Sequence, residues 1–460
     1  MQIDPRITSS GTIGVSHVRS NDDRGIVLPV ITEAAQQSLP LASTPEIGTS
    51  IELFTGGGGM ALAMHNSGFR HLAAVEIDKR ACATLRVNRA DPFDPEAHQA
   101  THLHSRWPLI EGDVKKVPFE RWKNQVHVVA GGVPCQPWSL GGAHKGYDDP
   151  RNLWPELFRV VRETQPLAVI AENVKGLLRP SFKPYYEYIL NELRAPFEER
   201  VRGDEDGEPR EDWEHHNKRL IKALKADTIP ADQRYDVKYM LVNAADYGVP
   251  QVRWRVFVVA FRSDLGLKEW QFPKPTHSEA ALLRAQADGS YWDEHKVAKR
   301  YRYRPEVSFD GKDDGEGTKR WRTLRDARKG DPARLEVPLR EPLGDKIDDP
   351  DHLHHIGWPG AREYAGHTAN ELDRPAKTVK AGVHGVPGGE TVMRRQDGSI
   401  RYMTVREVAR VMTFPDDWEL SGPRGEQMRQ LGNAVPVVLG EAIAKSVGDA
   451  LRPHLVNDPS

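Results

Sequence analysis

Cysteine is scarce in this chain of 460 residues, which contains only Cys82 and Cys135. Two cysteines cannot form the disulfide framework of a secreted domain, so we expect a reducing, cytoplasmic location. Long apolar runs are also missing, since no stretch approaches the roughly 18 apolar residues of a membrane span. The polar N-terminus lacks a signal-peptide core. These absences argue against a secreted or membrane-anchored protein.

A strong excess of either charge is absent too. The chain has 64 Lys and Arg against 66 Asp and Glu, for a formal net charge of −2. This balance neither requires nor excludes nucleic acid as a partner, because opposite charges can occupy different faces. The length predicts two or three domains with a sizeable core. Function must therefore be inferred from local motifs.

Apolar segments that alternate with helical patterns predict the fold. An apolar strand at 51–54 leads into a glycine loop and a helical run, and further apolar strands follow in "HLAAVEID", "VHVVAGGVPC", "PLAVIAENV" and "RVFVVAF". Such strands, separated by helices, are typical of a parallel sheet that is buried on both faces. We predict an α/β protein with a Rossmann-like, mostly parallel sheet that has helices on both faces, plus a smaller, irregular, β-rich domain.

Composition divides the chain into four parts. Residues 1–46 are polar and typical of a flexible tail. The strand–helix alternation covers 47–277, with a charge-dense insertion at 198–230 that is typical of a solvated helix. Residues 278–400 are rich in Gly, Pro, Arg and Asp and predict the second domain, and 401–455 form a helical, apolar ending.

Polar groups follow several predicted strands at the edge where such sheets bind ligands. The glycines after Phe54 would let the backbone approach a ligand closely, although a tight structural turn is an equal explanation. Glu76 ends the next strand, where a carboxylate commonly accepts hydrogen bonds from ribose hydroxyls, and Asp113 follows a third strand. Together these residues predict an adenosine-containing cofactor.

Cys135 lies in "GGVPCQPWS", between two prolines. A lone cysteine is most often a small buried hydrophobic residue, but a thiolate is also a strong nucleophile. Glu172 ends a neighbouring strand, and Arg253 and Arg255 are spaced to share one side of a strand. Each of these alone could be an ordinary surface residue, but their combination favours a catalytic site.

Eight blocks, in this order, resemble the DNA (cytosine-5) methyltransferase family over about residues 48–450: "FTGGGG", "VEID", "GDV", "GGVPCQPWS", "AENVKGL", "QVRWRVFVVA", "RYMTVREVARVMTFPDDW" and "QLGNAVPVVLGEAIA". The Pro-Cys-Gln, Glu-Asn-Val, Gln-x-Arg-x-Arg and Gly-Asn-Ala-Val-Pro elements are highly specific in combination. Gly57 and Asn152 depart from the family pattern, but neither touches a group that the chemistry needs, so neither puts the activity in doubt. The resemblance implies a bacterial enzyme that uses S-adenosyl-L-methionine.

The resemblance implies covalent catalysis on a cytosine that is flipped out of the duplex. Cys135 would attack C6, which makes C5 able to accept a methyl group. Glu172 would contact N3 and the exocyclic amine, while Arg255 and Arg253 would hold O2 and the sugar–phosphate region. The implied catalytic set is Cys135, Gln136, Glu172, Asn173, Arg253 and Arg255, with Asn173 supporting the loop of Cys135.

The cofactor site is implied in the same way. The methyl donor would be S-adenosyl-L-methionine, and no metal is expected, because no cysteine accompanies the "HLHH" run at 352–355. The implied cofactor contacts are Phe54, Gly56, Gly58, Gly59, Glu76, Ile77, Asp113, Val114, Pro134, Asn433 and Ala434. Since Asn433 belongs to this set, residues 401–455 would return to the catalytic domain at 47–277.

For DNA, the resemblance implies a mobile loop after Cys135, with Ser139 and Arg151 as contacts, and a target-recognition domain at 278–400 with Thr378 and Val379 as contacts. The base-filling side chain would come from "GWPGAREYAGHT". We expect a monomer that acts on double-stranded DNA and no membrane partner. A cognate restriction endonuclease, if present, would act separately. The segment from "SFKPYYEYI" to "REDWEHHNKRL" resembles enzymes that methylate GG(A/T)CC-type sites, which makes such a site one candidate.

Three alternatives are weighed against this interpretation. An RNA cytosine-5 methyltransferase is disfavoured because the tRNA-methylating branch's Cys-Phe-Thr signature is absent and the second domain is long. A catalytically silent DNA-binding relative is disfavoured by the intact Cys135, Glu172 and Arg255. A nicotinamide-dependent oxidoreductase is disfavoured because the GxGxxG fingerprint is absent.

Overall fold

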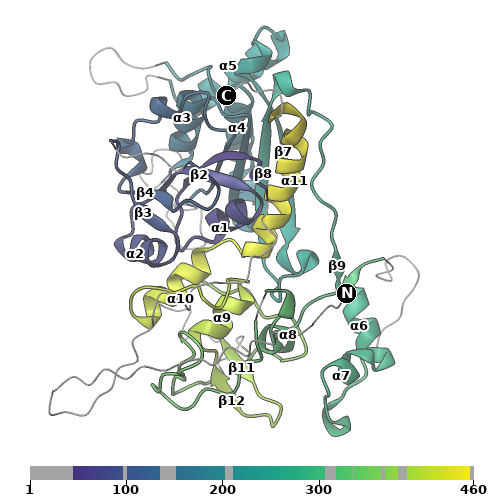
Figure 1. Cartoon of the computed structure of the whole chain (residues 1–460). Helices are drawn as coiled ribbons and strands as arrows, with labels where there is room; N and C mark the ends of the chain where they lie inside the picture. The colour runs from purple at the N-terminus through teal and green to yellow at the C-terminus, as the bar shows by residue number, and fades with distance from the viewer. Residues whose placement is uncertain are drawn as a thin grey trace, which may run out of the picture. The chain divides into compact units, whose positions relative to one another are not determined.

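The computed structural model describes residues 45–96, 101–134, 152–201, 211–305, 317–334, 336–363, 368–381 and 391–455. Its largest sheet has eight strands, in the order β3-β4-β2-β1-β5-β6-β8-β7 (Figure 1). The strands are β1 (Gly48–Leu53), β2 (Phe69–Glu76), β3 (Ala90–Pro92), β4 (Trp107–Glu111), β5 (Val128–Gly132), β6 (Ala168–Val174), β7 (Tyr235–Asn243) and β8 (Trp254–Arg262). The predicted α/β fold with a mostly parallel sheet is confirmed.

One strand runs against the expected direction. Strands β1 to β6 pair in parallel, whereas β8 pairs antiparallel with both β6 and β7. The expectation that "RVFVVAF" continues the parallel pattern is therefore wrong, because apolar content reports burial on both faces and not strand direction. As a consequence, the start of β8 lies beside the ends of its neighbours, and Arg255 pairs with Val174 at the end of β6.

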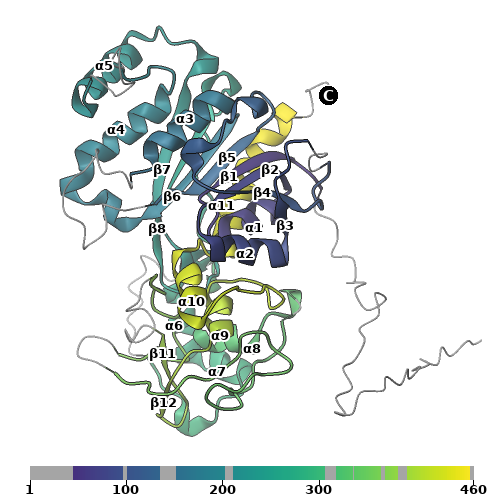
Figure 2. The same cartoon turned by 90° about the vertical axis from the view of Figure 1, so that its left-hand side faces the viewer.

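Helices cover both faces of the sheet. In Figure 2, α3 (Trp154–Thr164) and α4 (Lys183–Arg194) lie on one side, and α1 (Gly59–Asn66) and α11 (Val437–Leu455) lie on the other. The two faces form separate apolar clusters with the sheet. Helix α11 approaches α1 closely, because a Cβ built on Gly440 would lie 2.6 Å from the Cβ of Ala63. Helix α2 (Lys79–Asn88) adds Cys82 and Leu85 to a third cluster.

The charged insertion is less solvated than its composition predicts. It contains α5 (Trp213–Ala226), on which both His216 and Leu220 are fully buried. Tyr188 on α4 places its hydroxyl 3.1 Å from Nδ1 of His216. The expectation of a helix is met, but the expectation of a wholly solvated one is wrong, because one stripe of α5 packs on α4.

Short elements build the region after residue 276. They are β9 (His277–Ser278), α6 (Glu279–Asp288), α7 (Ser290–Glu294), β10 (Lys319–Arg320), α8 (Leu324–Lys329), β11 (Val392–Arg394), β12 (Ile400–Tyr402), α9 (Val405–Val411) and α10 (Arg424–Asn433). Strand β9 pairs in parallel with β10, and β11 pairs antiparallel with β12. Residues 44–460 form one compact unit, so the boundaries at 277/278 and 400/401 stay predictions.

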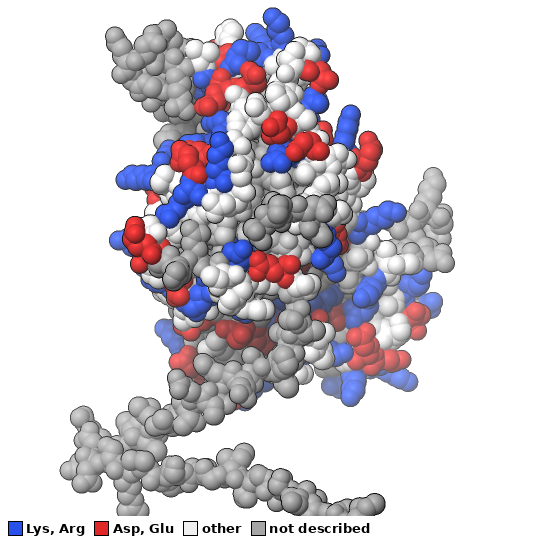
Figure 3. All heavy atoms as spheres, turned by 45° about the horizontal axis from the view of Figure 1, so that its top comes forward, with Lys and Arg blue, Asp and Glu red and all other residues white. Residues whose placement is uncertain are grey.

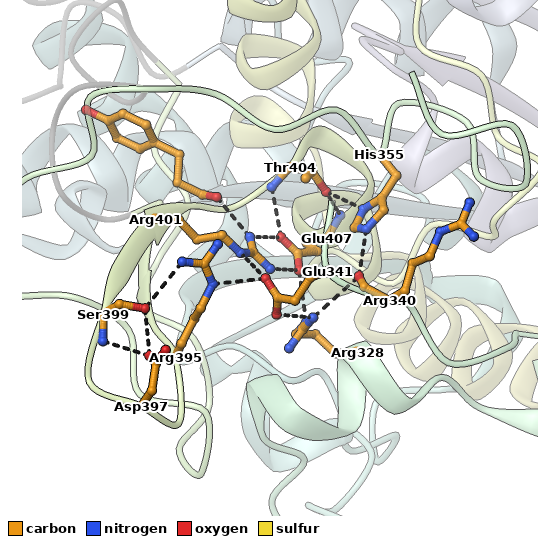
Figure 4. Close-up of polar contacts among 11 residues, drawn as sticks. Arg328, Arg340, Glu341, His355, Arg395, Asp397, Ser399, Arg401, Thr404 and Glu407 are labelled. Atoms are coloured by element: carbon orange, nitrogen blue, oxygen red, sulfur yellow. Dashed lines mark hydrogen bonds and ion pairs between the residues drawn. The ribbon is translucent and has the colours of Figure 1, made fainter. Parts of the chain in front are cut away.

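A buried polar network holds this region together (Figure 4). Glu407, on α9, is 1% exposed and accepts hydrogen bonds from both Nη atoms of Arg401, at 2.6 and 2.7 Å, and from Nε of Arg328, at 2.9 Å. It also caps its own helix reciprocally with Thr404. Burial alone would raise the pKa of Glu407, but the two arginines lower it to about 2. The ionised carboxylate is therefore the form that the fold requires.

The surface carries both signs of charge. On the described part of the face in Figure 3, Lys and Arg are interspersed with Asp and Glu. Acidic and basic side chains are therefore not separated into different areas on this part of the surface. Among the described helices, none combines the length and apolar character that a membrane crossing demands.

Candidate active site

Several predicted site residues meet at one edge of the sheet. Because β1, β2, β4, β5 and β6 are parallel, their carboxyl ends lie at the same edge, and the antiparallel β8 starts there. This edge holds the glycine loop after β1, Glu76 at the end of β2 and Glu172 near the end of β6. The register of the sheet therefore brings together segments that are far apart in the sequence.

The glycine loop is a tight turn into α1. The backbone N–H of Gly58 donates to the carbonyl of Thr55 at 3.0 Å, and Phe54 and Gly58 have φ of 55° and 95°. A Cβ on Gly58 would lie 2.7 Å from the ring of Trp418, and one on Gly59 would overlap the carbonyl oxygen of Val435. Glycine is therefore required at both positions, by close packing as well as by conformation.

The C-terminal segment reaches this loop from about 360 residues away in the sequence. Trp418 donates from Nε1 to the carbonyl of Gly57 at 3.2 Å. Ala434 lies beside Gly59, while the neighbouring Asn433 is exposed. Trp418 is absent from the site residues that the sequence predicts, although it ends the block "RYMTVREVARVMTFPDDW". The position of this tryptophan at the end of a family-specific block is the sequence signal that could have identified it as a site residue.

Glu76 anchors the glycine loop to the end of β2. Its carboxylate accepts hydrogen bonds from the backbone N–H groups of Gly56 at 2.6 Å, Ile77 at 2.9 Å and Asp78 at 2.7 Å. Burial raises the pKa of Glu76, and the three N–H groups act in the opposite direction. A buried carboxylate is thus held directly against the loop.

Three further residues predicted to bind the cofactor, Ile77, Asp113 and Val114, follow β2 and β4 and differ in exposure. Gly112 donates its N–H to the Glu76 carbonyl at 2.8 Å, which places the next residue, Asp113, close by. Asp113 is partly exposed and caps a short helix, accepting from Lys115 N at 3.0 Å, and Val114 is buried. Ile77 is 66% exposed, which is unusual for an apolar side chain beside buried strands.

Glu172 and Arg255 form a buried ion pair at the same edge. Nε of Arg255 lies 2.6 Å from Oε1 of Glu172, and the two residues are only 9% and 6% exposed. A Cβ on Gly132 would lie 3.3 Å from Oε2 of Glu172, so the carboxylate faces the end of β5. Burial raises the pKa of Glu172, although Arg255 and Arg253 oppose the shift. A proton is therefore held more readily here than on an exposed glutamate.

The segment that leads to Cys135 is tied to β6. Asn173 donates from Nδ2 to the carbonyl of Val133 at 3.0 Å, and its Oδ1 accepts from the N–H of Val174 at 2.8 Å. Pro134 follows directly and is partly buried. The predicted residues Cys135, Gln136, Ser139 and Arg151 lie outside the described residues.

Arg253 is placed differently from Arg255. It is fully buried, and it donates to the backbone carbonyls of Val379 and Gly432, both at 2.7 Å, and Ala434 at 2.9 Å. None of the N–H donors of Arg253 is exposed. The contact with the sugar–phosphate region that the family resemblance implies would need an exposed donor. Val379 is also buried, and the hydroxyl of Thr378 donates to a backbone carbonyl in the segment before β8, so DNA contacts at these two residues stay predictions.

Residues of metal-ligand type also have protein partners. Glu294, His295 and Asp326 lie close together, but Arg320 pairs with Glu294 at 2.9 Å and with both oxygens of Asp326. Both carboxylates of this cluster are therefore already paired with Arg320. Each histidine at 352–355 has a different hydrogen-bond partner. These partners are the Asp349 carboxylate for His352, the Leu420 N–H for His354 and the Thr404 hydroxyl for His355.

Comparison with known proteins agrees with this geometry. The chain is 30% identical over 407 residues to the type II methyltransferase M.NgoMIV of Neisseria gonorrhoeae, covering 88% of this chain and 98% of that protein. It is 30% identical to the type II methyltransferase M.Eco47II of Escherichia coli, covering 87% and 78%. A crystal structure from E. coli, described as a prophage-encoded DNA modification methyltransferase, superimposes with a TM-score of 0.50 at 19% identity, covering 89% of this chain and 100% of that one, which supports the fold.

The model of one protein family covers most of the chain. The model for C-5 cytosine-specific DNA methylases matches residues 48–195 and 213–449. These ranges contain the glycine loop, the Glu172–Arg255 pair and the C-terminal segment that packs on the loop. The chain therefore belongs to the C-5 cytosine-specific DNA methylase family, and it is a DNA (cytosine-5) methyltransferase.

Proposed function

We propose that this protein transfers a methyl group from S-adenosyl-L-methionine to C5 of a flipped cytosine in a specific duplex DNA site, through a covalent Cys135–C6 intermediate. The observation that carries the proposal is the buried Glu172–Arg255 ion pair, 2.6 Å apart, at the sheet edge that also holds the glycine loop. A carboxyl group and a guanidinium in this arrangement match the polar edge of a cytosine ring. The hydrogen bond from Asn173 to Val133 holds the described segment that leads to Cys135.

The proposed chemistry assigns one task to each side chain. The thiolate of Cys135 adds to C6, and Glu172 gives a proton to N3 as electron density moves onto the ring. Arg255 contacts O2 and keeps the Glu172 carboxyl oriented. After methylation, the proton on C5 is lost, the thiolate is eliminated and N3 returns its proton to the Glu172 carboxylate, which restores the aromatic ring and the starting form of Glu172. The raised pKa of Glu172 suits this role, because burial favours the protonated carboxyl.

The residues near Glu76 fit an adenosylated cofactor. S-adenosyl-L-methionine, when bound, supplies the electrophilic methyl group. Positive-φ glycines let the backbone approach the ligand, Glu76 and Asp113 offer carboxylate acceptors, and Ile77 offers an exposed apolar surface for a flat ring. Asn433 would complete the site from the C-terminal segment.

The proposed partner is double-stranded DNA. Relatives named type II methyltransferases support a role as the modification enzyme of a restriction–modification system. In this proposal residues 278–400 select the target, while the sheet edge performs the chemistry. A restriction endonuclease would recognise the same site as a separate protein.

Methyl transfer from labelled S-adenosyl-L-methionine to duplex DNA, single-stranded DNA and RNA tests the proposal. Expression in a host without DNA methylation, followed by bisulfite sequencing, then identifies the target sequence. We expect labelled duplex DNA and protected cytosines within one sequence context. Labelled RNA with unlabelled DNA, or no label on any nucleic acid, would contradict the proposed function.

Replacing Glu76 with alanine should weaken binding of S-adenosyl-L-methionine by about 10- to 100-fold. The change removes an acceptor for charge-assisted hydrogen bonds, whose loss costs roughly 1.5–3 kcal/mol. It also releases the Gly56 N–H that shapes the loop. Isothermal titration calorimetry measures the effect.

Glu111→Ala is the matched control. Glu111 pairs with Glu76 in the register of β4 and β2, but its carboxylate is exposed and pairs with Arg86. Glu111→Ala should leave cofactor affinity within about twofold, as expected for an exposed ion pair. Equal affinities for the two variants would remove Glu76 from the cofactor site.

A further inference from the structure

Three segments meet around the Arg253 side chain. The first is the stretch 250–253 before β8, the second is 376–381 in the proposed target-recognition region, and the third is 432–435, which spans the end of α10. Arg253 donates to a carbonyl in the second segment and to two in the third. It is 0% exposed, so every one of these bonds is shielded from water.

The first two segments are joined along their backbones. Gln251 and Ala376 form a parallel β-bridge, and the N–H of Val252 donates to the Ala376 carbonyl at 2.8 Å. The fully buried Gln251 accepts from the N–H of Val379 at 3.1 Å, and Thr378 donates its hydroxyl to Val252 O at 2.8 Å. The position of 376–379 is thus fixed directly against the stretch that begins β8.

The second and third segments approach at backbone distance. A Cβ on Gly432 would overlap the backbone of Lys380 and Ala381, so only glycine fits at this crossing. The same three segments therefore converge from separate parts of the chain. Arg253 is the one side chain among them that bonds to both of the other segments at once, within the residues that the structure describes.

This junction lies two residues from the proposed catalytic pair. Arg255 follows Arg253 along the chain, and its Nε lies 2.6 Å from Glu172. A shift of 376–381 or 432–435 would therefore move Arg253 and the backbone at 253. Arg255, which orients the Glu172 carboxyl, would move with it. Displacements of about 1 Å at a reacting group can reduce rates by roughly 100-fold.

We propose that Arg253 is a positioning residue, which couples the target-recognition segment 376–381 and the cofactor-side segment 432–435 to the catalytic Glu172–Arg255 pair. It acts by holding backbone carbonyls and not by touching the nucleotide. The inference rests on the proposed methyl transfer to DNA. It assigns to Arg253 a part in that reaction different from the phosphate contact that the sequence implies.

Arg253→Lys tests the coupling, because lysine keeps the charge but lacks the planar fork that reaches several carbonyls. The matched control is Arg410→Lys. Arg410 is 2% exposed and also donates to three backbone carbonyls, those of Ala327, Arg328 and Val337, and to Asp416, none of which lies at the proposed site. Gln251→Met is a second, milder variant at the same junction and serves if Arg253→Lys does not fold.

Three quantities are measured for each folded variant: the urea unfolding free energy, the dissociation constant for duplex DNA, and the single-turnover methyl-transfer rate at saturating DNA and cofactor. We expect similar losses of stability for Arg253→Lys and Arg410→Lys. Only Arg253→Lys and Gln251→Met should lose rate, by about 10-fold or more, with DNA affinity within about threefold of wild type.

Two results would overturn the inference. Equal rates for Arg253→Lys and Arg410→Lys would show that Arg253 has a purely structural role. A loss of DNA affinity with an unchanged saturated rate would show that Arg253 contacts the nucleotide instead. Wild-type transfer in the same assay tests the proposed function separately, so an active wild type with equal variants contradicts only the coupling.

Discussion

Replacing Cys135 with serine will reduce methyl transfer by on the order of 1,000-fold or more while leaving the fold and cofactor binding nearly intact. An alcohol is a far weaker nucleophile than a thiolate at neutral pH, and the proposed attack on C6 depends on that nucleophile. Single-turnover transfer of labelled methyl groups to duplex DNA measures the loss. Trapping of a covalent protein–DNA complex should fail in the same variant.

The second cysteine provides the control for this experiment. Cys82 is 1% exposed, donates from Sγ to the carbonyl of Glu76, and burial raises the pKa of its thiol to about 12. It is therefore protonated at neutral pH and cannot act as the nucleophile. Cys82→Ala should retain most of the methyl-transfer rate. A Cys135→Ser enzyme that works at a rate near wild type would contradict the covalent mechanism.

Replacing Glu407 with glutamine will lower the free energy of unfolding by about 3 kcal/mol at pH 7. The pKa of Glu407 falls from 4.5 to about 2 in the folded protein, and each pKa unit corresponds to about 1.4 kcal/mol. The substitution removes the buried carboxylate that pairs with both Arg401 and Arg328 and leaves them only the more exposed Glu341 (Figure 4). Urea unfolding at equilibrium measures the difference.

The pH dependence gives a sharper test. Because the folded pKa is lower than the unfolded one, the ionised carboxylate stabilises the fold above about pH 4.5, and this contribution is lost as the pH falls through about 2. The difference in unfolding free energy between wild type and Glu407→Gln should therefore become smaller below pH 4.5. Glu371→Gln, at an ion pair that is about half exposed, should cost less than about 1 kcal/mol. A gap independent of pH would rule out the ionised network as the cause.

The sequence by itself determined the fold class and the candidate site at the sheet edge. Apolar strands that alternate with helices specify a sheet buried on both faces, and the ends of parallel strands must meet at one edge. The common location of the glycine loop, Glu76 and Glu172 therefore follows from the strand pattern alone. The ordered blocks could also be matched to the family, because the proposed catalytic groups lie in short, specific motifs.

Only the tertiary structure decided the direction of β8, the partial burial of α5 and the environment of Arg253. Hydrophobic patterns report how much of a segment is buried, but not which way a strand runs or which distant backbone a side chain meets. Arg253 and Arg255 are two residues apart and chemically identical, yet Arg255 pairs with Glu172 whereas Arg253 donates to three backbone carbonyls. Their difference depends on segments more than 120 residues away in the chain, which no local pattern records.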